Sequence, residues 1–154
     1  MSDNEQNEQA LPPLQVNAQY IKDMSFEVPG APTIFVELQN ASPDISVQVN
    51  LNAQPLQENL FEMTLQLNIK AELNGKTAFI VELSYGGVFT LNVPPEHVQP
   101  MLLIECPRLL FPFVRNIVAD VTRDGGFPPM LLQPIDFVQL YRQRLDELAP
   151  EGNA

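Results

Sequence analysis

Few residues of this sequence are of a type that could do covalent or acid–base chemistry. His97 is the only histidine and Cys106 the only cysteine among 154 residues. His97 has no serine or cysteine motif beside it, so a structural role is favoured over that of a general base. Cys106 precedes Pro107 at an expected helix start, where the helix dipole could stabilise a thiolate, but a small buried cysteine is the commoner state. We therefore predict no catalytic residue.

Sequence motifs for nucleotide, metal and acyl chemistry are also absent. The sequence holds no G-x-x-x-x-G-K-[ST] or G-x-G-x-x-G loop, no H-E-x-x-H and no G-x-S-x-G. A single cysteine excludes an internal disulfide and a cysteine-based metal cluster. We expect no cofactor, no metal site and no enzyme activity. The alternative is a small acid–base enzyme that uses His97 with a nearby carboxylate.

Charge and hydropathy limit the possible partners. The 19 acidic residues outnumber 8 basic ones, which gives a net charge of −11 and repels polyanions such as nucleic acid. The uncharged apolar run at residues 101–104 is too short to span a bilayer. The polar N-terminus has no basic segment leading into an apolar one. We expect a soluble, cytoplasmic protein that neither binds nucleic acid nor inserts into a membrane.

The first half of the chain is predicted to form four antiparallel strands. Apolar and polar residues alternate through residues 61–93 around an Asn74-Gly75 turn, which predicts a long β-hairpin. Residues 16–28 and 45–53 alternate in the same way. The stretch between these two strands is too long for a tight turn and is predicted to be an apolar crossover loop of the kind found at binding sites.

The second half has the period of helices. Apolar residues at helical spacing from Leu110 to Val121, ended by Gly125, predict a long amphipathic helix. A shorter helix is predicted over 96–105 and a last one from Pro134. Strands followed by helices predict an α+β fold, a four-stranded antiparallel sheet with helices packed on one face. The other sheet face is expected to stay open.

A single domain is expected over residues 13–148. It lies between an acidic tail, residues 1–12, and a second tail, residues 149–154, which are both predicted to be disordered. Within the hairpin, Gly86-Gly87 is predicted to mark a bulge or bend.

The open sheet face is expected to be acidic. If the strands alternate strictly, one set of side chains from the first and fourth strands points outward. The set is Gln19, Ile21, Asp23, Ser25 and Glu27 of the first strand and Ala78, Ile80, Glu82 and Ser84 of the fourth. No basic residue occurs between Asp23 and Ile69, so these charges are uncompensated locally. Two interpretations stay open: the acids keep the face hydrated, or they form a docking surface for a basic partner.

Aromatic residues suggest a second surface. Phe35 lies in the crossover loop, Phe61 and Phe79 in the hairpin and Phe113 in the long helix. Most such rings belong to a core. Where the loop does not close fully over the hairpin and helix, they would line an apolar groove for an extended polypeptide.

Several dispersed motifs make the sequence similar to the SecB family of bacterial export chaperones. These are YIKDMSFE at 20–27 followed by PGAP at 29–32, TAFIVE at 77–82 with GGVF at 86–89, CPRLLFPFVR at 106–115, and GFP at 126–128 leading to PIDF at 134–137. They occur in the family's order and cover the chain from about residue 14 to 148.

The resemblance implies a cytoplasmic, ATP-independent holdase. Such a chaperone binds unfolded precursor proteins, keeps them translocation-competent and delivers them to the SecA motor ATPase for Sec-dependent export. A homotetramer, built as a dimer of dimers, is implied as well. The alternative is a specialised SecB-like chaperone with a non-export client, such as a toxin partner.

Site residues follow by position from the resemblance. SecA docks its basic, zinc-binding C-terminal tail on the acidic face, at Asp23, Glu27, Ile80 and Glu82, so that any zinc belongs to the partner. Client-groove positions are Phe35, Phe61, Phe79 and Phe113. Positions used for oligomer assembly are Val81, Leu83 and Tyr85, although alternation alone places these three in the core.

Overall fold

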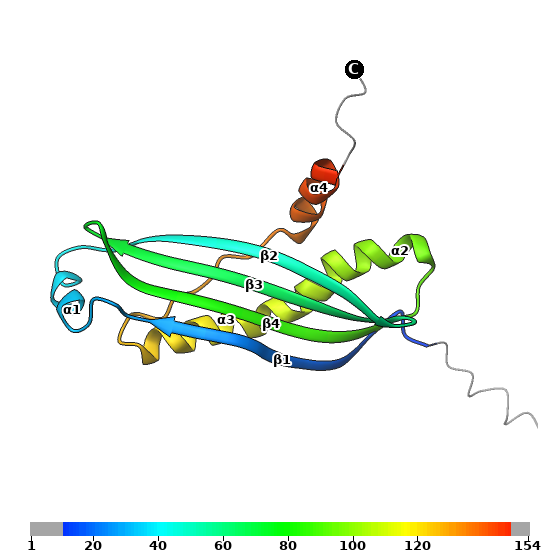
Figure 1. Ribbon diagram of the computed structural model, residues 1–154, viewed down its shortest axis with the longest axis horizontal. Coiled ribbons are helices and arrows are strands. Elements are labelled where there is room, and N and C mark those ends of the chain that lie inside the picture. The colour runs from blue at the N-terminus through cyan, green and yellow to red at the C-terminus, as the bar shows by residue number, and fades with distance from the viewer. Residues whose placement is uncertain (1–10, 149–154) are drawn as a thin grey trace, which may run out of the picture.

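The computed structural model describes residues 11–148 and is built on one antiparallel sheet (Figure 1). Its strands are β1 (Leu14–Glu27), β2 (Asp44–Gln57), β3 (Leu60–Leu73) and β4 (Lys76–Leu91), in the spatial order β1-β4-β3-β2. The four predicted antiparallel strands are confirmed. Disordered tails were predicted at residues 1–12 and 149–154. Residues 1–10 and the whole of 149–154 lie outside the described residues.

Helices cover one face of the sheet. They are α1 (Thr33–Glu37), α2 (Pro95–Pro100), the π-helical segment η1 (Met101–Glu105), α3 (Cys106–Asp124) and α4 (Phe137–Leu148). In Figure 1, α3 crosses behind the sheet, α1 lies at one end of it, and α4 projects beyond the β2 edge. No helix of the described chain covers the opposite face. The predicted α+β architecture is confirmed.

The core lies between the sheet and α3. Alternate residues of β3 and β4 meet one stripe of the helix there, and the fully buried side chains include Met63, Leu65, Leu67, Ile69, Val81, Phe89, Leu110, Val114 and Val118. Burying each large aliphatic side chain contributes about 1.5–3 kcal/mol to folding. Because β3 and β4 show the cleanest alternation, the sequence predicts their buried face correctly except at Ala78.

The predicted bulge at Gly86-Gly87 is wrong. β4 passes through both glycines in register with β3. The glycines instead allow close packing from the two sides of the sheet: a Cβ on Gly86 would lie 2.8 Å from the Tyr20 ring, and one on Gly87 would lie 2.7 Å from the Phe89 ring. The two small residues therefore mark close contact of the strand with aromatic rings and not a bulge.

Register shifts occur instead in β1, and they change which side chains share a face. Ile21 lies opposite Tyr85 and therefore on the helix-covered face, whereas Tyr20 lies opposite Gly86 on the open face. Strict alternation predicted the reverse for Ile21 and Tyr20, because each bulge reverses the phase of the strand. Ala78, also predicted to face outward, lies at a register shift between β3 and β4 and is fully buried.

The helix boundaries also differ from the predicted ones. α2, η1 and α3 follow one another without a gap, whereas two separate helices were predicted. Pro107 has no N–H for the usual bond to the preceding turn, and the backbone widens before it so that Cys106 N–H bonds Met101 O. α4 begins at Phe137, three residues later than predicted, because Asp136 caps its N-terminus.

Candidate functional site

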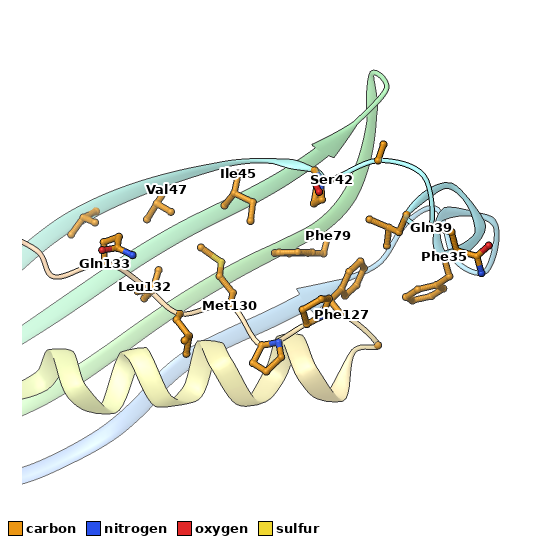
Figure 2. A pocket seen from close by; sticks show the side chains of 18 of the residues that line it. Phe35, Gln39, Ser42, Ile45, Val47, Phe79, Phe127, Met130, Leu132 and Gln133 are labelled. Carbon is orange, nitrogen blue, oxygen red and sulfur yellow. The ribbon is translucent and has the colours of Figure 1, made fainter.

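An apolar cavity of about 960 Å³ opens at the α1 end of the sheet (Figure 2). Its three walls are α1 with the loop after it, the edge strand β2, and residues 126–135, which join α3 to α4 and are called here the linker wall. The apolar lining includes Phe35, Ile45, Val47, Phe79, Phe127, Met130 and Leu132. Few polar side chains line it. A space of this size and character is suited to apolar side chains of a ligand.

Phe127 lies at the centre of a cluster of four aromatic rings beside the cavity. Its ring centroid is 4.9 Å from that of Phe79, 5.2 Å from Phe35 and 6.4 Å from Phe26. Gly126, at φ +97°, turns the chain into this cluster, and a Cβ there would lie 2.9 Å from the Phe35 ring. The cluster therefore joins β1, β4, α1 and the linker wall beside the cavity.

The four predicted groove phenylalanines divide into two groups. Phe35 and Phe79 line the cavity. Phe61 lies ten residues along β3 from Ala71, the partner of Phe79, which places it roughly 30 Å from Phe79 along the sheet. Phe113 is half exposed on α3 and its ring stacks on Tyr85, with centroids 6.1 Å apart. A client-binding role for Phe61 and Phe113 stays a prediction.

Sequence reasoning missed the linker wall. Phe127, Met130 and Leu132 line the cavity but were not among the predicted groove residues. The available signal was the Pro128-Pro129 pair, which prevents a helix, directly beside large apolar side chains.

The open face brings the four predicted docking residues together. On this face, Asp23 lies opposite Ser84, Ser25 opposite Glu82, and Glu27 opposite Ile80. The four docking residues therefore occupy three successive pairs of the β1–β4 ladder on the open face. Asp23, Glu27 and Glu82 are exposed. None of these three carboxylates has an ion-pair partner within residues 11–148. We call Asp23, Glu27, Ile80 and Glu82 the acidic face.

Next to the acidic face, Glu62 forms a polar cluster with Tyr20 and Lys22 that neutralises the charge of Lys22. Glu62 accepts hydrogen bonds from Tyr20 Oη and from Lys22 Nζ, the latter at 2.9 Å. The hydrogen bond from Tyr20, followed by that from Lys22, lowers the pKa of the Glu62 carboxyl. Burial, assisted by Glu62, raises the pKa of Tyr20 to about 12. Because Lys22 is paired with Glu62, it leaves the charge of Asp23 uncompensated.

The predicted assembly residues lie in the core of the subunit. Val81, Leu83 and Tyr85 are 0, 2 and 6 % exposed on the helix-covered face. Tyr85 Oη donates to Gln19 Oε1 at 3.3 Å, and burial raises the pKa of its hydroxyl. Their use in oligomer assembly stays a prediction.

The two residues considered for chemistry lie in different surroundings. Cys106 is fully buried, and burial, together with the charge of Glu105, raises its thiol pKa to about 12. His97 is exposed on α2. Residues 11–148 contain no group of three His, Cys, Asp or Glu side chains that could hold a metal ion. Among the helices that the structure describes, none has the length and hydropathy needed to cross a membrane.

Comparison with known proteins places these features in a family. The family model described as "Preprotein translocase subunit SecB" matches residues 6–148. The chain is 58% identical to the protein-export protein SecB of Paramagnetospirillum magneticum, with 100% of both chains covered. It is 55% identical to the protein-export protein SecB of a Bradyrhizobium species, covering 98% of this chain and 94% of that protein.

A solved structure shows the same fold at low identity. The SecB-like chaperone of Mycobacterium tuberculosis, in complex with a peptide from an antitoxin, aligns with a TM-score of 0.65 and 13% identity over 80% of this chain and 91% of that one. The fold, the family model and the full-length identity agree. The chain therefore belongs to the SecB family and functions as a protein-export chaperone.

Proposed function

We propose that the apolar cavity binds segments of unfolded precursor proteins and that the acidic face docks the SecA motor ATPase. The cavity supports client binding most directly, because its walls offer aromatic and aliphatic side chains and few fixed polar contacts. Burial of apolar client side chains needs no particular sequence. A chaperone for many different precursors requires such tolerance.

The acidic face supports docking of the basic C-terminal tail of the motor. Asp23, Glu27 and Glu82 present three exposed carboxylates beside the apolar Ile80 on adjacent strands. A basic segment would gain charge-assisted hydrogen bonds there, and its apolar side chains could rest on Ile80. The zinc of that tail would be bound by the partner's own ligands.

The chaperone would work without ATP or any cofactor, as a cytoplasmic holdase and not as an enzyme. With no energy source on this chain, release would come from transfer of the client to the motor. Assembly into a homotetramer, a dimer of dimers, is supported by apolar side chains exposed on α3 and the linker wall, namely Leu109, Phe113 and Leu131. Full-length identity to protein-export proteins favours export over a toxin-related role.

A refolding assay tests the holdase function. An unfolded export precursor is diluted into buffer with and without the protein, and with no nucleotide present. We expect the protein to slow refolding in proportion to its concentration, because bound segments cannot pack. Unchanged refolding would contradict the proposal.

A pair of double variants tests the docking face. Asp23→Ala with Glu82→Ala is expected to abolish binding of the motor's C-terminal tail, measured by calorimetry. The matched control is Asp44→Ala with Glu72→Ala, which removes the same charge from an opposed pair on the β2–β3 side of the open face. Equal weakening by both variants would show that overall charge, and not the acidic face, attracts the tail.

A further inference from the structure

The linker wall is attached to the rest of the fold through one backbone hydrogen bond beyond Phe127. Met130 N–H donates to Thr122 Oγ1 at 2.9 Å. Within residues 11–148, no other hydrogen bond involves the backbone of residues 128–135. Three of these residues are prolines, which have no N–H to donate.

Thr122 is an unusual residue for its place in α3. It follows Val114 and Val118 at intervals of four along the buried stripe, and its side chain is fully buried. Packing alone would favour an apolar residue there. Its hydroxyl donates to Val118 O at 2.8 Å while accepting from Met130, so both capacities of the hydroxyl are used.

The hydrogen bond from Met130 N–H to Thr122 Oγ1, called here the tether, lies between the two parts of the linker wall that shape the cavity. On one side of it, Phe127 is held in the aromatic cluster with Phe35 and Phe79. On the other side, Met130 and Leu132 face the cavity opposite β2 (Figure 2). Without the tether, the wall beyond Phe127 would be held by side-chain contacts alone.

We infer that Thr122 is a positioning residue of the client groove, which fixes the linker wall at the separation from β2 that keeps the cavity open. This inference rests on the proposed binding of clients in the cavity. A wall already held in place does not have to be ordered when a client binds, so less conformational entropy is lost. Thr122 thus raises client affinity without touching the client.

The test compares Thr122→Val, which keeps the shape but removes the hydroxyl, with Thr122→Ser, which keeps the hydroxyl. Binding of a fluorescent, unfolded apolar peptide is measured by anisotropy, and exchange of the Met130 amide by mass spectrometry. For valine we expect about tenfold weaker peptide binding and faster Met130 exchange, because one buried hydrogen bond is lost. The serine variant should match the wild type in peptide affinity and in the rate of Met130 amide exchange.

Docking of the motor's tail on the acidic face is the folding control and should be unchanged in both variants. If the valine variant does not fold, Thr122→Ala replaces it, since the smaller alanine side chain also lacks the hydroxyl. A folded variant that lacks the hydroxyl yet binds the peptide like wild type would overturn the positioning role alone. Weaker binding with unchanged Met130 exchange would overturn the tether. Failure of the wild type to bind would overturn the client site itself.

Discussion

Glu62 shows how one side chain keeps the acidic face free. Of its two hydrogen-bond donors, Tyr20 precedes the second bulge of β1 and Lys22 lies within it, and the Glu62 side chain is only 14% exposed. Paired with Glu62, the ammonium group of Lys22 does not neutralise Asp23, its neighbour in sequence. The carboxylate therefore fixes a strand irregularity and also preserves the charge next to it.

Glu62→Gln is expected to change the pH dependence of stability. The pKa of Glu62 is lowered in the folded state, so its contribution is present above the ordinary value of 4.5 and is lost as pH falls through the folded-state pKa. We expect the variant to be less stable than wild type by about 1–3 kcal/mol at pH 7, through loss of hydrogen bonds to a charged acceptor. Urea denaturation at pH 7 and at pH 3 measures the difference in unfolding free energy between the variant and wild type at each pH.

The difference between Glu62→Gln and wild type should be smaller at pH 3 than at pH 7, because the stabilisation that comes with the lowered pKa of Glu62 is lost as the carboxyl takes up a proton. Glu72→Gln is the matched control, since Glu72 is half exposed and pairs with Lys70 on the same face. A stability gap for Glu62→Gln that stayed constant between the two pH values would show that ionisation of Glu62 is not involved.

At the scale of elements, the turn of the β3–β4 hairpin could be predicted from adjacent residues, whereas the bulges of β1 could not. The β3–β4 hairpin depends on Asn74-Gly75, whose residues take positive φ as the turn requires. The bulges of β1 depend on pairing with β4, more than 60 residues away, and no short-range pattern marks them. Asp23 was nevertheless predicted correctly to lie on the open face. It follows the second bulge, and from there to Glu27 the strand alternates without interruption.

The same distinction applies to the site. Phe35 and Phe79 could be assigned to a groove from the crossover loop and the hairpin, which are visible in the sequence. The shape of the linker wall could not be predicted in the same way, because it depends on the Thr122–Met130 hydrogen bond and on the close approach of Gly126 to the Phe35 ring. Both are set by the packed structure.

The start of α4 offers a prediction at this scale. Asp136 Oδ1 accepts the Gln139 N–H at 3.0 Å and so caps the helix that follows the linker wall. Asp136→Ala is expected to destabilise α4 by about 0.5–2 kcal/mol, which would be measured as faster amide exchange over residues 137–148.

The matched change is Asp146→Ala at the other end of α4. An acid near a helix C-terminus is slightly unfavourable to the helix dipole, so this variant should leave exchange unchanged or slow it. Equal acceleration by both changes would mean that the cap does not set the stability of α4.

At the scale of the molecule, charge and apolar surface are separated. Residues 1–107 hold 13 acidic and 3 basic side chains, whereas residues 108–154 hold 6 and 5. The acidic excess thus lies in the part of the sequence that contains the sheet, and the acidic face is on its open side. The cavity lies between the other side of the sheet and the linker wall. The motor and the client would therefore contact opposite sides of one sheet, through different forces.

This separation predicts opposite responses to salt. Raising NaCl from 0.05 to 0.5 M shortens the Debye length to roughly 4 Å, which screens the exposed carboxylates of the acidic face. Binding of the motor's basic tail should weaken by tenfold or more, while an uncharged apolar client peptide should bind equally well, since burial of apolar surface does not depend on charge. Calorimetry with both ligands over one salt series provides the measurement. A parallel loss of both affinities would mean that client and tail share one charged surface, and the assignment of two faces would then be wrong.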